Sequence, residues 1–242
     1  MKCFLLLLFI GTYSLMVAQA PDGFPSTFTA AGSGNWNSIT WAEDVPGTDG
    51  DGIPDGDDYV IIENKDVTVT ANAGFGHLEF SASGNNEPIL TINSGVSLVG
   101  YLDEEDGAIT FAASGGKVFA GTKTLTCNIE GTVTCLWLTM ETTTTLGNIV
   151  CNLENGGTLT IDDDLTLICA GAAADTDVML DAGTTTGTSN VLNLGGLLIG
   201  ADGIDGVIDM GTAGKSTFNF NGAAPQTIKM GNPSDLRYSD IK

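Results

Sequence analysis

The chain has 242 residues, with 30 acidic residues against eight basic ones and a formal net charge of −22 at pH 7. A surface this acidic repels phosphate backbones, so we expect no nucleic-acid partner. Hydrophobic residues make up 42% of the chain and glycine contributes 33 residues. This composition excludes a disordered chain and favours short strands joined by glycine turns.

Residues 1–20 have the layout of a secretory signal peptide. A lysine at position 2 is followed by an apolar run and by small residues that end in Ala18-Gln19-Ala20. The run is too short and too early for a spanning helix. No later apolar run approaches the roughly 20 residues that a membrane span needs. We therefore expect an exported protein, secreted or at the outer cell surface, without a membrane span in its mature chain.

Residues 21–58 differ from the rest of the chain and predict an N-terminal cap. They contain Trp36 and Trp41, four prolines and little alternation of apolar and polar residues. An open sheet end invites edge-to-edge pairing with another chain. We expect the two tryptophan rings to cover the first strands that follow.

The stretch 47-GTDGDGIPDGDD-58 places five aspartates in twelve residues. A twelve-residue calcium loop has oxygen ligands at positions 1, 3, 5, 7, 9 and 12, with glycine at position 6. Gly52 occupies position 6 when the loop starts at Gly47. This alignment predicts a structural Ca²⁺ site whose ligands are Asp49, Asp51, the carbonyl of Ile53, Asp55 and Asp58.

Position 1 of this loop is a glycine, so Glu43, Asp44 or a water would have to complete the shell. A hydrophilic turn is the other interpretation, because aspartate and glycine suit turns by themselves. Against it, carboxylates packed this closely repel one another unless a cation or protons neutralise them. A bound ion would stiffen the cap and would take no part in catalysis.

Residues 59–242 form a series of short β-prone runs, such as 67-VTVTA and 89-ILTI, each ending at Gly, Asp or Asn. The phrase 126-TCNIEGTVT-134 returns as 150-VCNLENGGTLT-160. A period in the twenties with several strands per period predicts a β-solenoid. A β-sandwich is less favoured, because tight hairpin turns are not systematically present between the runs. The chain stops inside the strand-like phrase 236-LRYSDIK-242, so we expect the solenoid to continue in a longer protein.

After removal of the signal peptide four cysteines remain: Cys127, Cys135, Cys151 and Cys169. An even count in an exported protein suggests disulfides. The repeat places Cys127 beside Cys151 in neighbouring coils. A disulfide there and a ladder of buried free thiols both remain open.

The sequence predicts no catalytic residue. A lyase acting on acidic polysaccharide would need basic side chains, yet Arg237 is the single arginine and His77 the single histidine. The acidic residues do not single out a hydrolase pair. The alternative function is a polysaccharide-active β-helix enzyme, a lyase or glycoside hydrolase, whose catalytic residues lie partly outside this segment.

Threonine arrays raise a third class of function, binding of ice or carbohydrate. Thr-x-Thr pairs occur at positions 124/126, 132/134 and 158/160. Strand propensity alone explains threonine at such positions. Because the pairs do not recur at one position in every repeat, the sequence does not favour this function.

Two phrases carry a resemblance to large exported proteins of Bacteroidetes-type bacteria. They are 34-GNWNSITWAEDVPG-47 with 59-YVIIENKDVTVTANA-73, and 218-FNFNGAAPQTIKMG-231 with 236-LRYSDI-241. The resemblance implies a right-handed parallel β-helix in a surface or secreted protein, often exported by the type IX secretion system. The phrase D-G-D-G-I-P-D also resembles calcium-binding thrombospondin type-3 repeats. We therefore expect a non-catalytic, adhesin-like structural segment that contacts extracellular glycans or a cell-surface partner.

Overall fold

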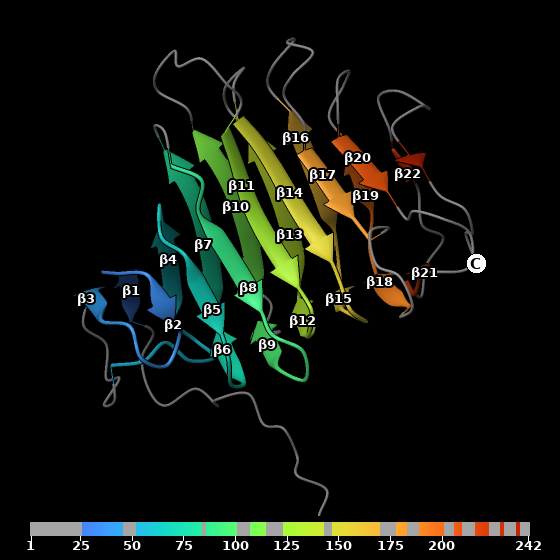
Figure 1. Cartoon of the computed structure of the whole chain (residues 1–242). Helices are drawn as coiled ribbons and strands as arrows, with labels where there is room; N and C mark the ends of the chain where they lie inside the picture. The colour runs from blue at the N-terminus through green and yellow to red at the C-terminus, as the bar shows by residue number, and fades with distance from the viewer. Residues whose placement is uncertain are drawn as a thin grey trace, which may run out of the picture.

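The computed structural model describes residues 26–45, 52–83, 86–100, 107–114, 123–142, 147–169, 178–182, 189–200, 206–209, 216–222, 228–229 and 236–237. The regular elements in these ranges are all strands, and successive strands cycle through three sheets (Figure 1). Nearly all neighbours pair in parallel, which is the arrangement of a parallel β-helix. The predicted all-β solenoid is confirmed.

Sheet A has nine strands in the order β22-β19-β16-β13-β10-β7-β4-β1-β3. They are β1 (Thr27–Ala30), β3 (Trp41–Val45), β4 (Tyr59–Glu63), β7 (His77–Ser83), β10 (Ala108–Ser114), β13 (Trp137–Thr142), β16 (Leu165–Cys169), β19 (Leu198–Gly200) and β22 (Ile228–Lys229).

Sheet B has eight strands in the order β2-β5-β8-β11-β14-β17-β20-β23. They are β2 (Gly34–Asn35), β5 (Val67–Val69), β8 (Ile89–Ile92), β11 (Lys123–Ile129), β14 (Gly147–Leu153), β17 (Val178–Asp181), β20 (Gly206–Asp209) and β23 (Leu236–Arg237).

Sheet C has six strands in the order β21-β18-β15-β12-β9-β6. They are β6 (Ala73–Phe75), β9 (Ser97–Gly100), β12 (Thr132–Cys135), β15 (Thr158–Ile161), β18 (Asn190–Leu194) and β21 (Ser216–Phe220).

The core lies inside the three sheets and consists of aliphatic columns. Strand side chains alternate between inside and outside, so one residue in two points inward. Because neighbouring coils stack in register, inward residues of the same position form a column that runs through the solenoid. One column of sheet A contains Val60, Leu78, Ile109, Leu138, Leu165 and Leu198, all at most 2% exposed.

The N-terminal segment occupies one end of the solenoid, as Figure 1 shows for β1, β2 and β3. β1 pairs in parallel with β4, and β2 pairs in parallel with β5, so both belong to a first coil. β3 pairs antiparallel with β1 and ends sheet A. Trp36 and Trp41 are buried there, with their rings in an edge-to-face contact 5.1 Å apart.

Cys127 and Cys151 lie directly opposite each other in β11 and β14, as the repeat predicted. Both thiols are free and buried, and Cys135 is a third buried free thiol. Hydrogen bonding to Cys151 and burial raise the pKa of Cys127 well above its ordinary value. The side chain of Cys169 lies outside the described residues. Within the described ranges, no helix is long and apolar enough to cross a membrane.

Candidate metal site

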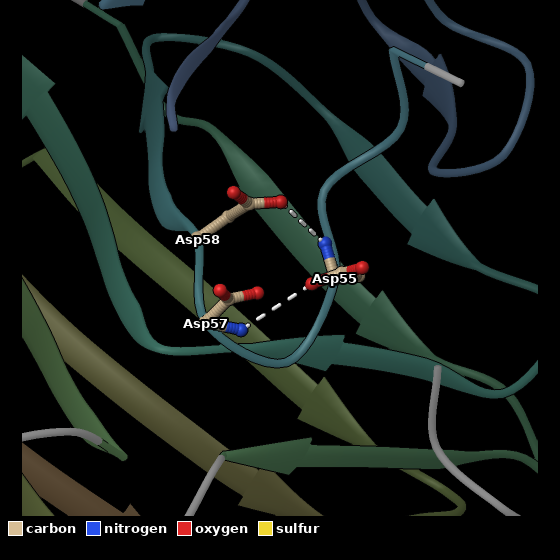
Figure 2. Close-up of side chains that lie close together, drawn as sticks. All are labelled: Asp55, Asp57 and Asp58. Carbon is tan, nitrogen blue, oxygen red and sulfur yellow. Dashed lines mark hydrogen bonds between the residues drawn. The ribbon is translucent and has the colours of Figure 1, made fainter. Parts of the chain in front are cut away.

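The candidate site is the turn that leads into β4, where Asp55, Asp57 and Asp58 converge (Figure 2). Each of them offers one carboxylate oxygen, and these three atoms all lie within 4.8 Å of one another. The Asp58 backbone N–H donates to the Asp55 carbonyl oxygen at 3.3 Å, which closes the turn. A tight turn therefore brings the three carboxylates together, and the group could hold a metal ion.

Asp58 stabilises this turn and fixes it against two other parts of the chain. Its Oδ1 accepts a hydrogen bond from the Ser26 N–H at 2.9 Å, and its Oδ2 accepts one from the Asp55 N–H at 2.8 Å. Its carbonyl oxygen accepts from the N–H groups of Gly76 and His77 at 2.8 and 3.0 Å. The side chain is only 2% exposed. Asp58 thus joins the residue before β1, the turn itself and the start of β7.

Asp55 lies in a less satisfied environment. The residue is fully buried, and only its Oδ1 has a hydrogen-bond partner, the Asp57 N–H at 3.3 Å. Its Oδ2 is buried without one. A buried polar atom without a partner is costly unless water, a proton or an ion satisfies it. Asp55 is the member of the cluster whose chemistry a cation would change most.

Burial raises the pKa of the Asp55 carboxyl from 3.8 to about 8. A hydrogen bond with the Asp57 side chain and the charges of Asp58 and Asp57 act in the same direction, while the Asp57 backbone N–H opposes them. At neutral pH the carboxyl therefore carries a proton when no cation is present. A bound divalent cation would displace that proton.

The backbone behind the turn leaves no space for a side chain at Gly76. A Cβ atom there would lie 2.6 Å from the Asp57 carbonyl oxygen and 2.7 Å from its carbonyl carbon. The fold therefore requires glycine at this position to hold the aspartate turn close to the start of β7.

The structure brings together only part of the predicted ligand set. Asp55 and Asp58 both lie in the cluster, whereas Asp49 and Asp51 lie outside the described residues. The side chain of Ile53 packs against the hydrophobic core. Asp57 is in the cluster but absent from the predicted set, because the twelve-residue template assigns no ligand to its position.

Comparison with protein-family models, with curated proteins and with solved structures finds no match to this chain.

Proposed function

We propose that this chain is a non-catalytic structural segment of an exported, adhesin-like protein, stiffened at its N-terminal end by a calcium ion. The observation that carries this proposal is the Asp55–Asp57–Asp58 cluster at the end of a parallel solenoid. Each coil adds about 4.8 Å along the axis of the solenoid. Such a fold therefore serves as a rigid spacer that holds attached segments away from the cell surface. In the described structure the first coil has a neighbouring coil on one side only, so an ion bound there would oppose unravelling from that end.

The chemistry of the cluster favours calcium over other metals. Its ligands are carboxylate oxygens, which hard cations prefer, and the described part of the turn contributes no cysteine or histidine. Calcium accepts six to eight oxygens in flexible geometry, whereas magnesium demands a near-ideal octahedron. Carboxylates at positions 55, 57 and 58 of one turn, supplemented by carbonyl oxygens and water, suit the more tolerant ion.

Contact with extracellular glycans is supported by an outward column on sheet A. Tyr59, His77, Ala108 and Trp137 lie at the same register position in four successive strands. The Tyr59 and His77 rings stack 4.4 Å apart, with planes 9° from parallel. The Trp137 Nε1–H donates to Asp163 at 2.9 Å. Half-buried aromatic rings with polar groups beside them offer an amphipathic platform for a sugar.

Calorimetric titration of residues 21–242 with Ca²⁺ tests the cation site. We expect a stoichiometric heat and a higher thermal midpoint in calcium than in chelator. The free energy of unfolding should rise by about 2.7 kcal/mol at a calcium concentration of 100 times Kd. Because Asp55 holds a proton at neutral pH, the heat should also vary with the ionisation enthalpy of the buffer.

Asp55→Asn and Asp57→Asn should each abolish the heat and the shift in midpoint. Asp162→Asn removes one charge from another acidic run, at an exposed position in the turn before β16, and should leave both unchanged. Equal heats in Asp55→Asn and the unsubstituted chain would reject the cluster as the site. No heat in the unsubstituted chain would reduce the stretch to a hydrophilic turn.

A further inference from the structure

The outward face of sheet C is the one sheet face without charge in the described structure. The described strands β6, β9, β12, β15, β18 and β21 contain no charged residue at all. Sheet A carries Glu63, Glu79 and Glu141, and sheet B carries Asp181 and Asp209. All three residues of β6 are buried, so the outward face spans the other five strands. In a chain with a net charge of −22, a neutral face across five stacked strands needs a physical explanation.

This face consists of two parallel columns of small side chains. Register pairing places Thr132 opposite Thr158 and Thr134 opposite Thr160, so two of the Thr-x-Thr pairs coincide. The third pair, Thr124/Thr126, lies on sheet B. The residues paired with these threonines in neighbouring strands complete both columns. The first column is Ser97, Thr132, Thr158, Val191 and Thr217, and the second, two residues further along each strand, is Val99, Thr134, Thr160, Asn193 and Asn219.

The columns form a regular and rigid grid. Neighbouring strands lie about 4.8 Å apart, and two residues along a strand span about 6.6 Å. Threonine and valine have few χ1 rotamers. In addition, Asn219 Nδ2 donates to Asn193 Oδ1 at 2.9 Å, and Asn193 Nδ2 donates to Thr160 Oγ1 at 3.0 Å. The side chains are therefore held in place before any ligand arrives, which lowers the entropic cost of binding.

The dimensions of the face exclude the common kinds of partner. Five strands of about four residues cover roughly 24 by 13 Å, or about 300 Å², whereas a stable protein interface buries about 800 Å² per partner. Soluble ligands bind in concave pockets that enclose most of their surface, which a row of strands with only small outward side chains does not provide. The matching ligand is an extended, neutral solid whose own surface repeats.

Ice is the neutral repeating solid that this chemistry fits best. Each threonine presents a hydroxyl, which can hydrogen-bond a lattice water, and a methyl group, which lowers the cost of removing liquid water from the face. Crystalline polysaccharides are also flat, but the outward positions of the two columns hold no aromatic ring on which a sugar could stack. We propose that the outward face of sheet C, between β9 and β21, binds ice.

Partition into slowly grown ice tests this proposal directly. Residues 21–242 should concentrate in the ice fraction, and ice crystals in their presence should show altered shape and slowed recrystallisation. Thr132→Lys/Thr158→Lys places two charged side chains in one column. It should lower the fraction of protein in the ice to the fraction measured for serum albumin, which serves as the control protein. Thr139→Lys/Thr166→Lys introduces the same change at two paired outward threonines of sheet A and should retain the partition of the unsubstituted chain.

Circular dichroism and thermal unfolding establish that each variant is folded. If the double variant on sheet C does not fold, the single variants Thr132→Lys and Thr158→Lys replace it. Exclusion of the unsubstituted chain from ice overturns the proposal, as does an equal loss in the variants of sheets A and C. Exclusion from ice, together with sedimentation with crystalline cellulose or chitin that is lost in Thr132→Lys/Thr158→Lys and retained in Trp137→Ala, would assign the face to an insoluble polysaccharide instead.

Discussion

Asp55 and Asp58 are both buried, yet they have different roles. Both oxygens of Asp58 accept backbone N–H groups, so this carboxylate is satisfied without any ion. Asp55 has a buried oxygen without a hydrogen-bond partner and a pKa raised to about 8. Asp58 therefore builds the turn, whereas Asp55 responds to protons and cations.

The raised pKa of Asp55 predicts a specific dependence of stability on pH. The folded state takes up a proton at a pH where the unfolded carboxyl, with a pKa near 3.8, has lost it. Without a divalent cation, this group's contribution to the free energy of unfolding therefore falls as pH rises from about 4 to about 8. Saturating calcium should reduce this slope, because the cation replaces the proton.

Urea unfolding in chelator across this pH range, for the unsubstituted chain and Asp55→Asn, measures the contribution. The other carboxylates titrate in both proteins, so the difference between the two curves isolates Asp55. We expect the stability of the variant to rise relative to that of the unsubstituted chain between pH 4 and pH 8. Stability curves that remain parallel throughout this pH range would show that folding does not raise the pKa of Asp55.

The sequence predicts the location of this cluster better than its membership. Aspartate-rich turns are visible in any sequence, and a calcium template spaces its ligands along a loop. In the structure the cluster is instead local, because the bond from the Asp58 N–H to the Asp55 carbonyl brings residues 55, 57 and 58 into one turn. The partners that fix it, Ser26 and Gly76, are distant in sequence and become neighbours only through strand stacking.

At the scale of elements, alternation and one internal repeat were sufficient to predict the solenoid. The repeated phrase places Cys127 opposite Cys151, which the register confirms. Gly157, which directly precedes β15, has to be glycine, since a Cβ atom there would overlap the Ile129 carbonyl oxygen of the coil before it. The repeated phrase ends in T-V-T and T-L-T, so it also aligns Thr132 with Thr158. The other members of that column, Ser97, Val191 and Thr217, were not predictable, because the turns differ in length from coil to coil and no fixed period assigns a residue to a sheet.

The outward column of sheet A supports a prediction about glycan contact. Trp137 is the largest ring in this column, and it lies one strand beyond Ala108. Affinity electrophoresis in gels containing hydroxyethyl cellulose should retard the unsubstituted chain, and Trp137→Ala should weaken this binding at least about fivefold, or about 1 kcal/mol. Thr139→Ala changes an outward residue two positions further along β13 and should retain binding. Equal retardation of all three proteins would remove Trp137 from the contact.

For the molecule as a whole, net charge opposes the compact state. Thirty acidic residues against eight basic ones repel one another more strongly in the folded chain than in an expanded one. The Debye length falls from about 10 Å at 0.1 M salt to about 3 Å at 1 M. We therefore expect the thermal midpoint to rise steadily with sodium chloride, both in the unsubstituted chain and in Asp55→Asn/Asp57→Asn.

Comparing the effects of sodium chloride and calcium on the thermal midpoint distinguishes general screening of charge from binding at a specific site. At constant ionic strength, millimolar calcium should raise the midpoint of the unsubstituted chain and leave that of Asp55→Asn/Asp57→Asn unchanged, because only the former retains the cluster. If calcium raised both midpoints equally, diffuse attraction to the acidic surface would explain the effect without a site. A midpoint that falls with sodium chloride would instead mean that local ion pairs outweigh the net repulsion, against a composition in which most acidic residues lack a basic counterpart.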